Sequence, residues 1–368
     1  MTLPWTLFHY IARHFLLAIL LALFGLVAVS MLIDVVELIR RASGKEDVPL
    51  AVILELALLR IPYLAQKLAP YAVLIGSMLA LTRLTRTHEL VVARSAGVSV
   101  WQFLAPAMAV VMTLGVFMAT VFSPFAAVLL LRYEHIEGKY LTGTPSLLSI
   151  SSSGLWLRQV ENNEGNVGEH IIYTMRVSQS TMAFSHVIVF TYGKDKKFIE
   201  RLDADNGVLE AGALHLYKVT RSVPGYPPQM LPEYLLPTTL TLTHIQDSFA
   251  SPETMSFWHL PAFITMLEAA GFSALRHRLY WHSLLASPFL MAGTVFVAAV
   301  FSLRLPRRGR VGLLVVAGVL SGFMLHFFTD IIFALGSAGT LPVWLAAWTP
   351  AIVVIMLGAA LLLHLEDG

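Results

Sequence analysis

The chain has 368 residues, of which 57% are hydrophobic and 13% are charged, and its formal net charge is +2. Such a composition excludes an ordinary soluble domain and predicts an integral membrane protein. The sequence contains no cysteine, which excludes disulfides and thiolate metal sites.

Six apolar runs are each long enough to cross a bilayer, which takes about 20 residues of helix. A long, mostly polar insert separates the first three runs from the last three. The runs are His14–Val36, Leu54–Thr82, Val100–Leu131, Trp281–Leu303, Val311–Leu335 and Val343–Leu363. The sequence therefore predicts six transmembrane helices, with one domain inserted between the third and the fourth.

The first three spans carry features that modify a regular helix. Leu3–Arg13 mixes aromatic, aliphatic and basic residues and predicts an interfacial amphipathic helix before span one. Pro62 and Pro70 should bend span two. Pro124 marks the end of span three, and we expect the helix to continue out of the bilayer through Arg132–Gly138.

Basic residues in the short loops predict the orientation in the membrane. One set of loops is rich in arginine, and it contains Arg13, Arg83, Arg86, Arg94, Arg304, Arg307, Arg308 and Arg310. Arg40, Arg41 and Lys45 lie on the opposite side, where neighbouring carboxylates offset them. The arginine-rich loops should be cytoplasmic. Both termini are then cytoplasmic, and the insert, approximately residues 132–276, is periplasmic in a bacterium.

The insert has the pattern of short strands divided by Gly, Asn and Pro. The predicted strands are Leu155–Val160, Ile171–Val177, Met182–Thr191, Phe198–Leu202, Gly207–Glu210, Ala213–Thr220 and Thr238–Ile245. Many short strands at regular spacing predict an all-β sandwich or jelly roll. A helix from a Ser256 cap to Gly271 should follow and lead back to span four.

Catalytic motifs are missing from the sequence. There is no Walker A pattern, no His-Glu-x-x-His, no Gly-x-Ser-x-Gly and no Gly-x-Gly-x-x-Gly. Glu134 and His135 are adjacent and point to different helix faces, so the run Arg132–Glu137 is better explained as a solvated helix end than as a metal site. A membrane enzyme is therefore the least favoured function.

Ionisable residues occur within the spans, where they are costly and often functional. They are Asp34, Glu37, Glu55, Arg60, Lys67 and Asp330, and all fall in the periplasmic halves. Arg60 and Lys67 are seven apart and share a helix face, and His326 is four residues from Asp330. One explanation is that these side chains snorkel to the interface. The other is a cavity at outer-leaflet depth that receives a polar, anionic head group.

The segment Thr82–Ser99 between spans two and three is too short for a domain. It predicts a short helix along the membrane, with Leu90, Val91 and Ala93 apolar and with its end at Gly97. A short, charged helix of this kind suits docking into the groove of a partner protein.

Residues His88–Ser99 resemble the coupling-helix signature of the lipopolysaccharide export permeases, the LptF/LptG family. The resemblance covers nearly the whole chain and is weakest from about 160 to 250. It includes the three-plus-three layout and the following residues: Pro62, Pro70, Pro124, Gly154-Leu155-Trp156, the Ser256–Gly271 helix, Pro288 and Asp330. The last three spans are more similar to the LptG type than to the LptF type.

The resemblance implies a fold and a set of partners. The domains would be spans one to three with the coupling helix 83–98 (1–135), a periplasmic β-jelly-roll (136–255), and a linker helix with spans four to six (256–368). The partners would be a sister permease, a dimeric cytoplasmic ATPase, a single-span LptC-type protein and a periplasmic bridge protein, but no nucleic acid. The complex would extract lipopolysaccharide from the outer leaflet of the inner membrane. The chain itself would be non-catalytic and without a cofactor, because ATP and magnesium bind to the ATPase.

The resemblance also implies roles for individual residues. Glu89 would contact the ATPase, in a coupling segment that also holds Arg86, Arg94 and Gly97. The expected lipid-binding residues are Arg40, Arg41, Arg60, Lys67, Asp34 and Asp330. Asp34 departs from the family, which is basic there, so Lys67 or Arg60 would have to compensate.

Three alternatives remain open from the sequence alone. The chain could be the sister LptF-type subunit, a membrane-anchored periplasmic receptor or scaffold, or a permease for another lipid-linked substrate. A receptor or scaffold would require neither charges within the spans nor a docking helix.

Overall fold

The computed structural model describes residues 4–43, 48–142, 148–151, 154–163, 166–178, 183–193, 197–210, 212–238, 251–269, 273–302 and 311–366. The chain divides into two compact units. The membrane unit comprises 1–142, 253–258 and 275–368, and the β unit comprises 143–252 and 259–274.

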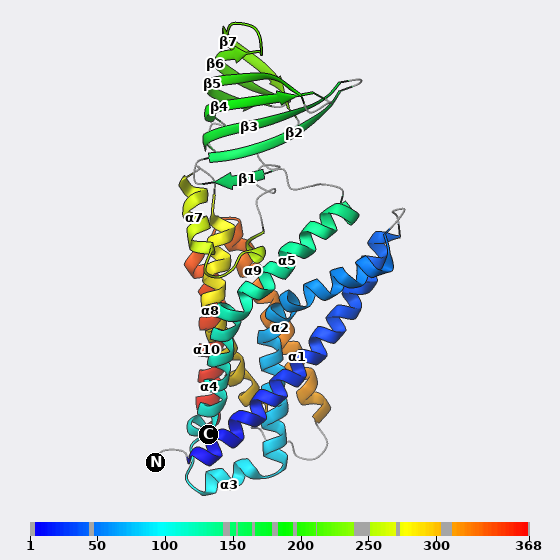
Figure 1. The fold of residues 1–368 in the computed structure, drawn as a ribbon. Coiled ribbons are helices and arrows are strands. Elements are labelled where there is room, and N and C mark those ends of the chain that lie inside the picture. The colour runs from blue at the N-terminus through cyan, green and yellow to red at the C-terminus, as the bar shows by residue number, and fades with distance from the viewer. Residues whose placement is uncertain are drawn as a thin grey trace. The chain divides into compact units, whose positions relative to one another are not determined.

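Helices make up the membrane unit (Figure 1). They are α1 (Trp5–Ala42), α2 (Leu50–Arg86), α3 (Glu89–Ser95), α4 (Val100–Phe117), the π-helical η1 (Met118–Phe122), α5 (Ser123–Glu137), the π-helical η2 (Gly138–Thr142), α8 (Leu275–Ser302), α9 (Val311–Ser337) and α10 (Val343–Glu366). Within the described residues, six helices are long and apolar enough to span a membrane, which confirms the prediction of six spans.

Two details of the predicted helices can be compared with the structure. From Trp5 onward the expected interfacial segment is part of α1, which runs without a break to Ala42 and so leads into span one as predicted. Pro124 does not interrupt the helix, because α5 starts at Ser123 and follows η1 directly. The expected continuation beyond the bilayer runs to Thr142.

Two of the apolar clusters in the described part of the membrane unit lie toward its two ends, and a smaller one joins α8 to α10 through Leu279, Ala346 and Ala347. The α3-end cluster joins α1, α2, α3, α4, α8 and α10, and its buried residues include Phe15, Leu81, Leu90, Phe103 and Val295. The β-end cluster lies at the end from which the chain leaves for the β unit. It joins α1, α2 and the α5–η2 helix through Leu38, Ala42, Ile53, Leu56, Ala57, Leu130, Tyr133 and Leu141.

The β unit contains one seven-stranded antiparallel sheet with the strands in sequence order. The strands are β1 (Leu148–Ser151), β2 (Gly154–Asn163), β3 (Asn166–Ser178), β4 (Ala183–Tyr192), β5 (Phe198–Glu210), β6 (Ala213–Ser222) and β7 (Gln229–Pro237). The short helices η3 (Pro252–Thr254) and α7 (Leu260–Ala269) follow in the chain. The expected helix thus begins at Leu260 rather than after Ser256, and Gly271 lies outside the described residues, as does most of the predicted strand Thr238–Ile245.

A crease crosses the sheet from β3 to β7. Ser185 pairs with Asn206 and Val187 with Ala204, which leaves His186 and Asp205 between two ladder positions. The same interruption falls at Met175 in β3, Lys218 in β6 and Pro232 in β7. In β4, β5 and β6 the buried positions change phase there, from 184 to 187, from 204 to 207 and from 216 to 219, so the apolar side chains of these strands face inward on both sides of the crease.

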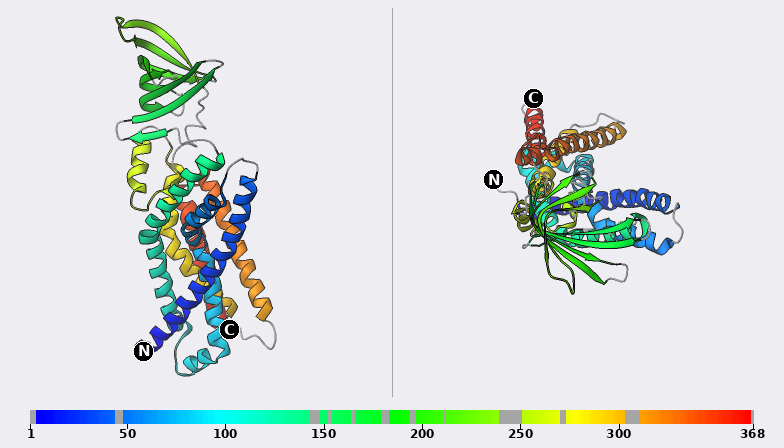
Figure 2. Two further views of the ribbon diagram at one scale, coloured as in Figure 1. Left: turned by 45° about the vertical axis from the view of Figure 1, so that its right-hand side comes forward. Right: turned by 90° about the horizontal axis from the view of Figure 1, so that it is seen from above.

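The crease accounts for the sandwich-like pattern that the sequence predicted. The inserted all-β domain is confirmed, but its described strands form one open, strongly curled sheet without the crossover connections of a jelly roll (Figure 2). The side chain of Gln159 in β2 bonds to Pro237 O and Thr238 Oγ1 beyond β7, at 3.2 and 2.7 Å, and so holds the curl. Because a curled sheet packs on itself, its strands alternate as those of two sheets do.

Candidate functional site

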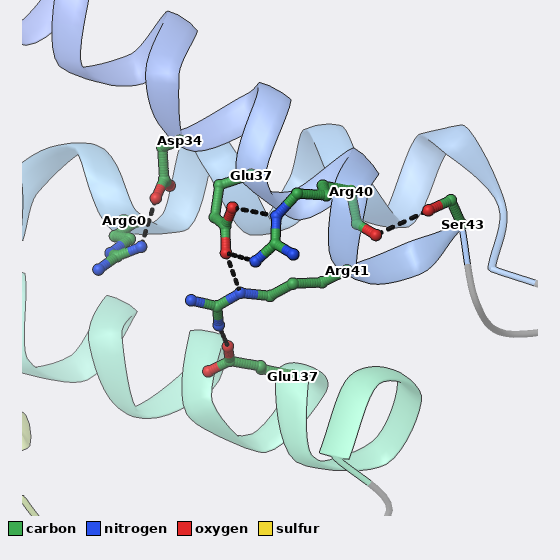
Figure 3. Close-up of polar contacts among 7 residues, drawn as sticks. All are labelled: Asp34, Glu37, Arg40, Arg41, Ser43, Arg60 and Glu137. Atoms are coloured by element: carbon green, nitrogen blue, oxygen red, sulfur yellow. Dashed lines mark hydrogen bonds and ion pairs between the residues drawn. The ribbon is translucent and has the colours of Figure 1, made fainter.

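The two arginines at the end of α1 share one carboxylate (Figure 3). Glu37 accepts from Arg40 Nε at 2.7 Å and from Arg41 Nε at 2.8 Å, both within one helical turn. Arg41 also reaches Glu137 on α5, with Nη1 3.2 Å from Oε1. Arg40 and Arg41 are thus exposed but partly neutralised, which leaves them less free to hold an anionic ligand than the sequence predicted.

Asp34 and Arg60 form an ion pair between α1 and α2 (Figure 3). The Arg60 guanidinium also lies over the ring of Tyr133 on α5, 5.4 Å from its centroid. The second oxygen of Asp34 is buried without a hydrogen-bond partner among the described residues. That Arg60 or Lys67 compensates for the acidic Asp34 in lipid binding stays a prediction; in the described structure the Asp34 carboxylate engages Arg60.

Glu55 and Arg132 make a third ion pair, from α2 to α5, with Oε1 and Nη2 2.6 Å apart. No role was predicted for Arg132, Tyr133 or Glu137, and a solvated helix end is wrong for Tyr133, which is 4% exposed. The four-residue spacing of Tyr133 and Glu137, which places both on one helix face, was the available signal. Among the residues that the structure describes, no three His, Asp or Glu side chains are grouped so that they could hold a metal ion.

Lys67 differs from these cations. It is exposed on α2 between Pro62 and Pro70, and no carboxylate lies within ion-pair distance of it in the described part of the chain. A lysine within a span that is neither buried nor paired is costly in a bilayer. Lys67 is therefore the cation of this region that is most available to an anionic ligand.

Asp330 lies on α9, apart from the three ion pairs. Its carboxylate is 3.4 Å from His326 Nε2, and the other ring nitrogen of His326, Nδ1, is 2.9 Å from the hydroxyl of Tyr71 on α2. The predicted contact between His326 and Asp330 is present. Among the described residues, Asp330 makes no ion pair with Arg40, Arg41 or Arg60, so the six expected lipid-binding residues divide into separate groups.

A short helix stands at the opposite end of the membrane unit from these ion pairs (Figure 1). α3 begins at Glu89, whose carboxylate accepts from the Thr87 hydroxyl at 2.8 Å. It ends at Gly97, which has φ +84° and closes the helix through the bond from Val98 N to Ala93 O. The predicted helix with an end at Gly97 is therefore present, while Arg86 belongs to the last turn of α2.

α3 is anchored on one face and open on the other. Leu90 and Ala93 are buried in the α3-end cluster, whereas Val91 and Val92 are exposed and Arg94 lies on the surface. Arg86 is exposed as well, and a capping box of Ser99 and Gln102 starts α4 directly after the helix. A rigidly held helix with exposed valines and arginines has the geometry of a docking element.

A family model describes nearly all of this chain. The model for the lipopolysaccharide export system permease LptF/LptG matches residues 9–364. The chain belongs to the LptF/LptG family. Among curated proteins, the lipopolysaccharide export system permease protein LptG of Haemophilus influenzae is 24% identical over 365 residues, which are 96% of both chains.

The match confirms the resemblance noted in the sequence. This LptF/LptG protein is a permease subunit of the lipopolysaccharide export system and a protein of the inner membrane. Membership of a permease family is consistent with a subunit that does not itself catalyse a reaction. The family model covers LptF and LptG together and does not separate the two types.

Proposed function

We propose that this LptF/LptG protein extracts lipopolysaccharide from the outer leaflet of the inner membrane and passes it to a periplasmic bridge protein. The observation that carries the proposal is the placement of two features at opposite ends of one bundle. The exposed α3 helix lies at one end, and the charged layer of Asp34, Arg41, Arg60 and Lys67 lies toward the other.

The proposed complex contains a sister permease, a dimeric cytoplasmic ATPase and a single-span LptC-type protein. The ATPase would bind ATP and magnesium, and this chain would hold no cofactor. Both termini and α3 would face the cytoplasm, and the β unit would face the periplasm. The arginines near α3, namely Arg83, Arg86 and Arg94, support this orientation because basic loops favour the cytoplasm.

The charged layer supports binding of the phosphorylated head group. Lipid phosphates are bound by arginine and lysine through charge-assisted hydrogen bonds. Lys67 is the residue that we expect to bind the head group most strongly. Carboxylates engage Arg40, Arg41 and Arg60, whereas among the described residues none forms an ion pair with Lys67. Arg40, at 72% side-chain exposure, retains enough free surface to contribute.

The test is ATP-driven release of lipopolysaccharide from vesicles that contain this chain, its sister permease and the ATPase, with a periplasmic acceptor outside. Glu89→Ala should leave assembly in the membrane intact and abolish release. Val92→Ala, three residues on along the same side of α3 and without a charge, is the matched control and should retain most of it. Unchanged release by Glu89→Ala would reject the coupling role, and lack of release by the unmodified complex would reject the substrate.

A further inference from the structure

Three helices connect the α3-end cluster to the β-end cluster, and α1 is weakly supported between them. In α1 the buried residues are Ile11, Phe15 and Ile19 at one end and Leu38 and Ala42 at the other. Between these groups lies Gly25, where an added Cβ would have no atom within 4 Å. Glycine within a helix favours bending relative to alanine, since it lowers helix propensity.

α2 has its prolines in the same interval. Its β-end residues Ile53–Ala57 and its α3-end residues from Ala69 onward belong to different clusters. Pro62 lies between them and Pro70 at the border of the second, and each lacks the amide hydrogen of a regular helical bond. Lys67 therefore lies between the two cores, in the interrupted part of the helix.

The third connection, from α4 to α5, contains a π-helical turn. Ser123 N–H bonds to Met118 O, five residues back, and the carbonyl of Thr120 faces Pro124 four residues on, which has no amide hydrogen to donate. The indole Nε1–H of Trp258 donates to Thr120 O at 2.9 Å instead. A side chain distant in sequence thus supplies the donor that the proline removes.

Trp258 joins this turn to the other side of the bundle. Phe257 contacts both Trp258 and Trp281 of α8, with ring centroids 5.1 and 6.3 Å apart. α8 contributes Met291, Val295 and Ala298 to the α3-end cluster. The hydrogen bond of Trp258 therefore links η1 to α8 through the rings of Phe257 and Trp281.

The β-end cluster is held together as one body. Each pair of its three helices shares an ion pair: Asp34–Arg60 joins α1 to α2, Arg41–Glu137 joins α1 to α5, and Glu55–Arg132 joins α2 to α5. Tyr133, buried beneath the Arg60 guanidinium, adds an apolar contact. A displacement of one helix therefore carries the other two with it.

We propose that the β-end cluster pivots as a lever on Gly25, the Pro62–Pro70 segment and η1, and that Trp258 is the positioning residue that sets its resting position. This inference rests on the proposed function, because the motion would open and close the space around Lys67 during lipid extraction. Trp258 acts through Thr120 and does not touch the lipid.

Distances between spin labels test the lever directly, and the chain has no cysteine that would interfere with labelling. Leu32 on α1 and Val128 on α5 are exposed sites within the β-end body, whereas Leu79 on α2 lies in the α3-end half. Double electron–electron resonance is measured on the full chain with its partner subunits in lipid nanodiscs. The Leu32/Val128 distribution should be narrow, and the Leu79/Val128 distribution should be broad or shift when nucleotide is added.

Trp258→Phe keeps the ring and removes the donor. Loss of one hydrogen bond should change the ratio of two lever positions about fivefold, seen in the Leu79/Val128 pair alone. Trp344→Phe is the matched control, since Trp344 is 61% exposed and Trp258 62%, and it should change neither distance. Equal, narrow distributions for both pairs with and without nucleotide, unaltered by Trp258→Phe, would overturn the proposal.

Lipid release from a cross-linked complex distinguishes a failure of the lever from a failure of the proposed function. A cleavable bifunctional thiol reagent that spans cysteines placed at residues 79 and 128 should reduce ATP-driven lipopolysaccharide release, and cleavage of the cross-link should restore it. If the uncross-linked complex releases no lipid, the substrate assignment fails while the spin-label distances still decide the lever. If the cross-linked complex releases lipid at the full rate, the lever is not part of transport.

Discussion

The two cores of the membrane unit are built in different ways. In the α3-end cluster the helices approach closely: a Cβ on Gly76 would lie 2.5 Å from Ile19 Cα, and one on Gly115 2.6 Å from Pro288 Cα. The β-end cluster joins its helices through three ion pairs instead. Close apolar packing makes the α3-end cluster rigid. The ion pairs of the β-end cluster instead hold its three helices to one another while the cluster as a whole can move against the rest of the bundle.

The largest effect should follow a change at the close contact of α1 and α2. Gly76→Val places a β-branched side chain against the Ile19 backbone and should reduce the free energy of unfolding by about 3 kcal/mol. Thermal unfolding in detergent, followed by retention on size-exclusion chromatography, measures the loss. Gly25→Ala on the unpacked part of α1 is the control, with an expected change within about 1 kcal/mol. Equal stability of both variants would contradict the packing difference.

A smaller loss should follow when one ion pair of the β-end cluster is broken. Asp34→Asn leaves Arg60 without its carboxylate and should cost about 2 kcal/mol, less than for a fully buried pair because the Arg60 side chain is 31% exposed. The double variant Asp34→Asn/Arg60→Gln removes the unpaired charge and should recover part of the loss. Strictly additive effects in this double-mutant cycle would show that the two side chains do not interact.

Substitution of Lys67 should weaken lipopolysaccharide binding without changing the stability of the protein. Because it is exposed and unpaired in the described structure, Lys67→Met should change the free energy of unfolding by no more than about 0.5 kcal/mol. Affinity for lipopolysaccharide in the same detergent should fall about tenfold, through loss of one charge-assisted contact to phosphate. Lys67→Arg keeps the charge and should bind nearly normally. A stability loss as large as that of Asp34→Asn would instead give Lys67 a structural role.

The smallest effect concerns the β unit. A hydrogen bond from Arg221 to Glu200, 2.7 Å long, raises the pKa of the Arg221 guanidinium above its already high ordinary value. A raised pKa on a cation means that its stabilisation is present below that pKa and lost only above it. Arg221→Gln should therefore lower stability by about 0.5 kcal/mol, equally throughout the neutral pH range. Thermal unfolding at several pH values measures this, and a difference that grows steadily with pH would contradict the pairing.

The sequence predicted the helices better than the side-chain contacts between them. Apolar length alone located the six spans, and the turn residues placed a helix between His88 and Gly97. Asp34 and Arg60, by contrast, are 26 residues apart on different helices, and nothing local indicates that they meet. The sequence could not predict that Trp258 bonds to Thr120, because this hydrogen bond replaces the one that the missing amide hydrogen of Pro124 would have made.

The strand β5 shows why a correct pattern can suggest the wrong boundary. The sequence predicted two strands, Phe198–Leu202 and Gly207–Glu210, where the structure has one. The buried positions are 200, 202 and 204 before the crease and 207 and 209 after it, so the alternation changes phase at Asp205 and Asn206. A periodicity of two does not continue through such a change of phase, so a sequence pattern reads it as a turn between two strands. The strand β7 was missed because Pro232 and Pro237 disfavour a strand.

The crease in the sheet also limits where residues can be inserted into or deleted from the strands of the β unit. Each of the strands β4, β5 and β6 has one additional residue at the same line, with His186 and Lys218 at positive φ. Deletion of one residue from a single strand would turn half of that strand over and place its apolar side chains in solvent. Loops between strands can lengthen or shorten one at a time, but at this line the strands β4, β5 and β6 must keep matching lengths. Single-residue deletions scanned along β5 should therefore be tolerated least on either side of Asp205, and deletions in the turn after Ser222 should be tolerated most.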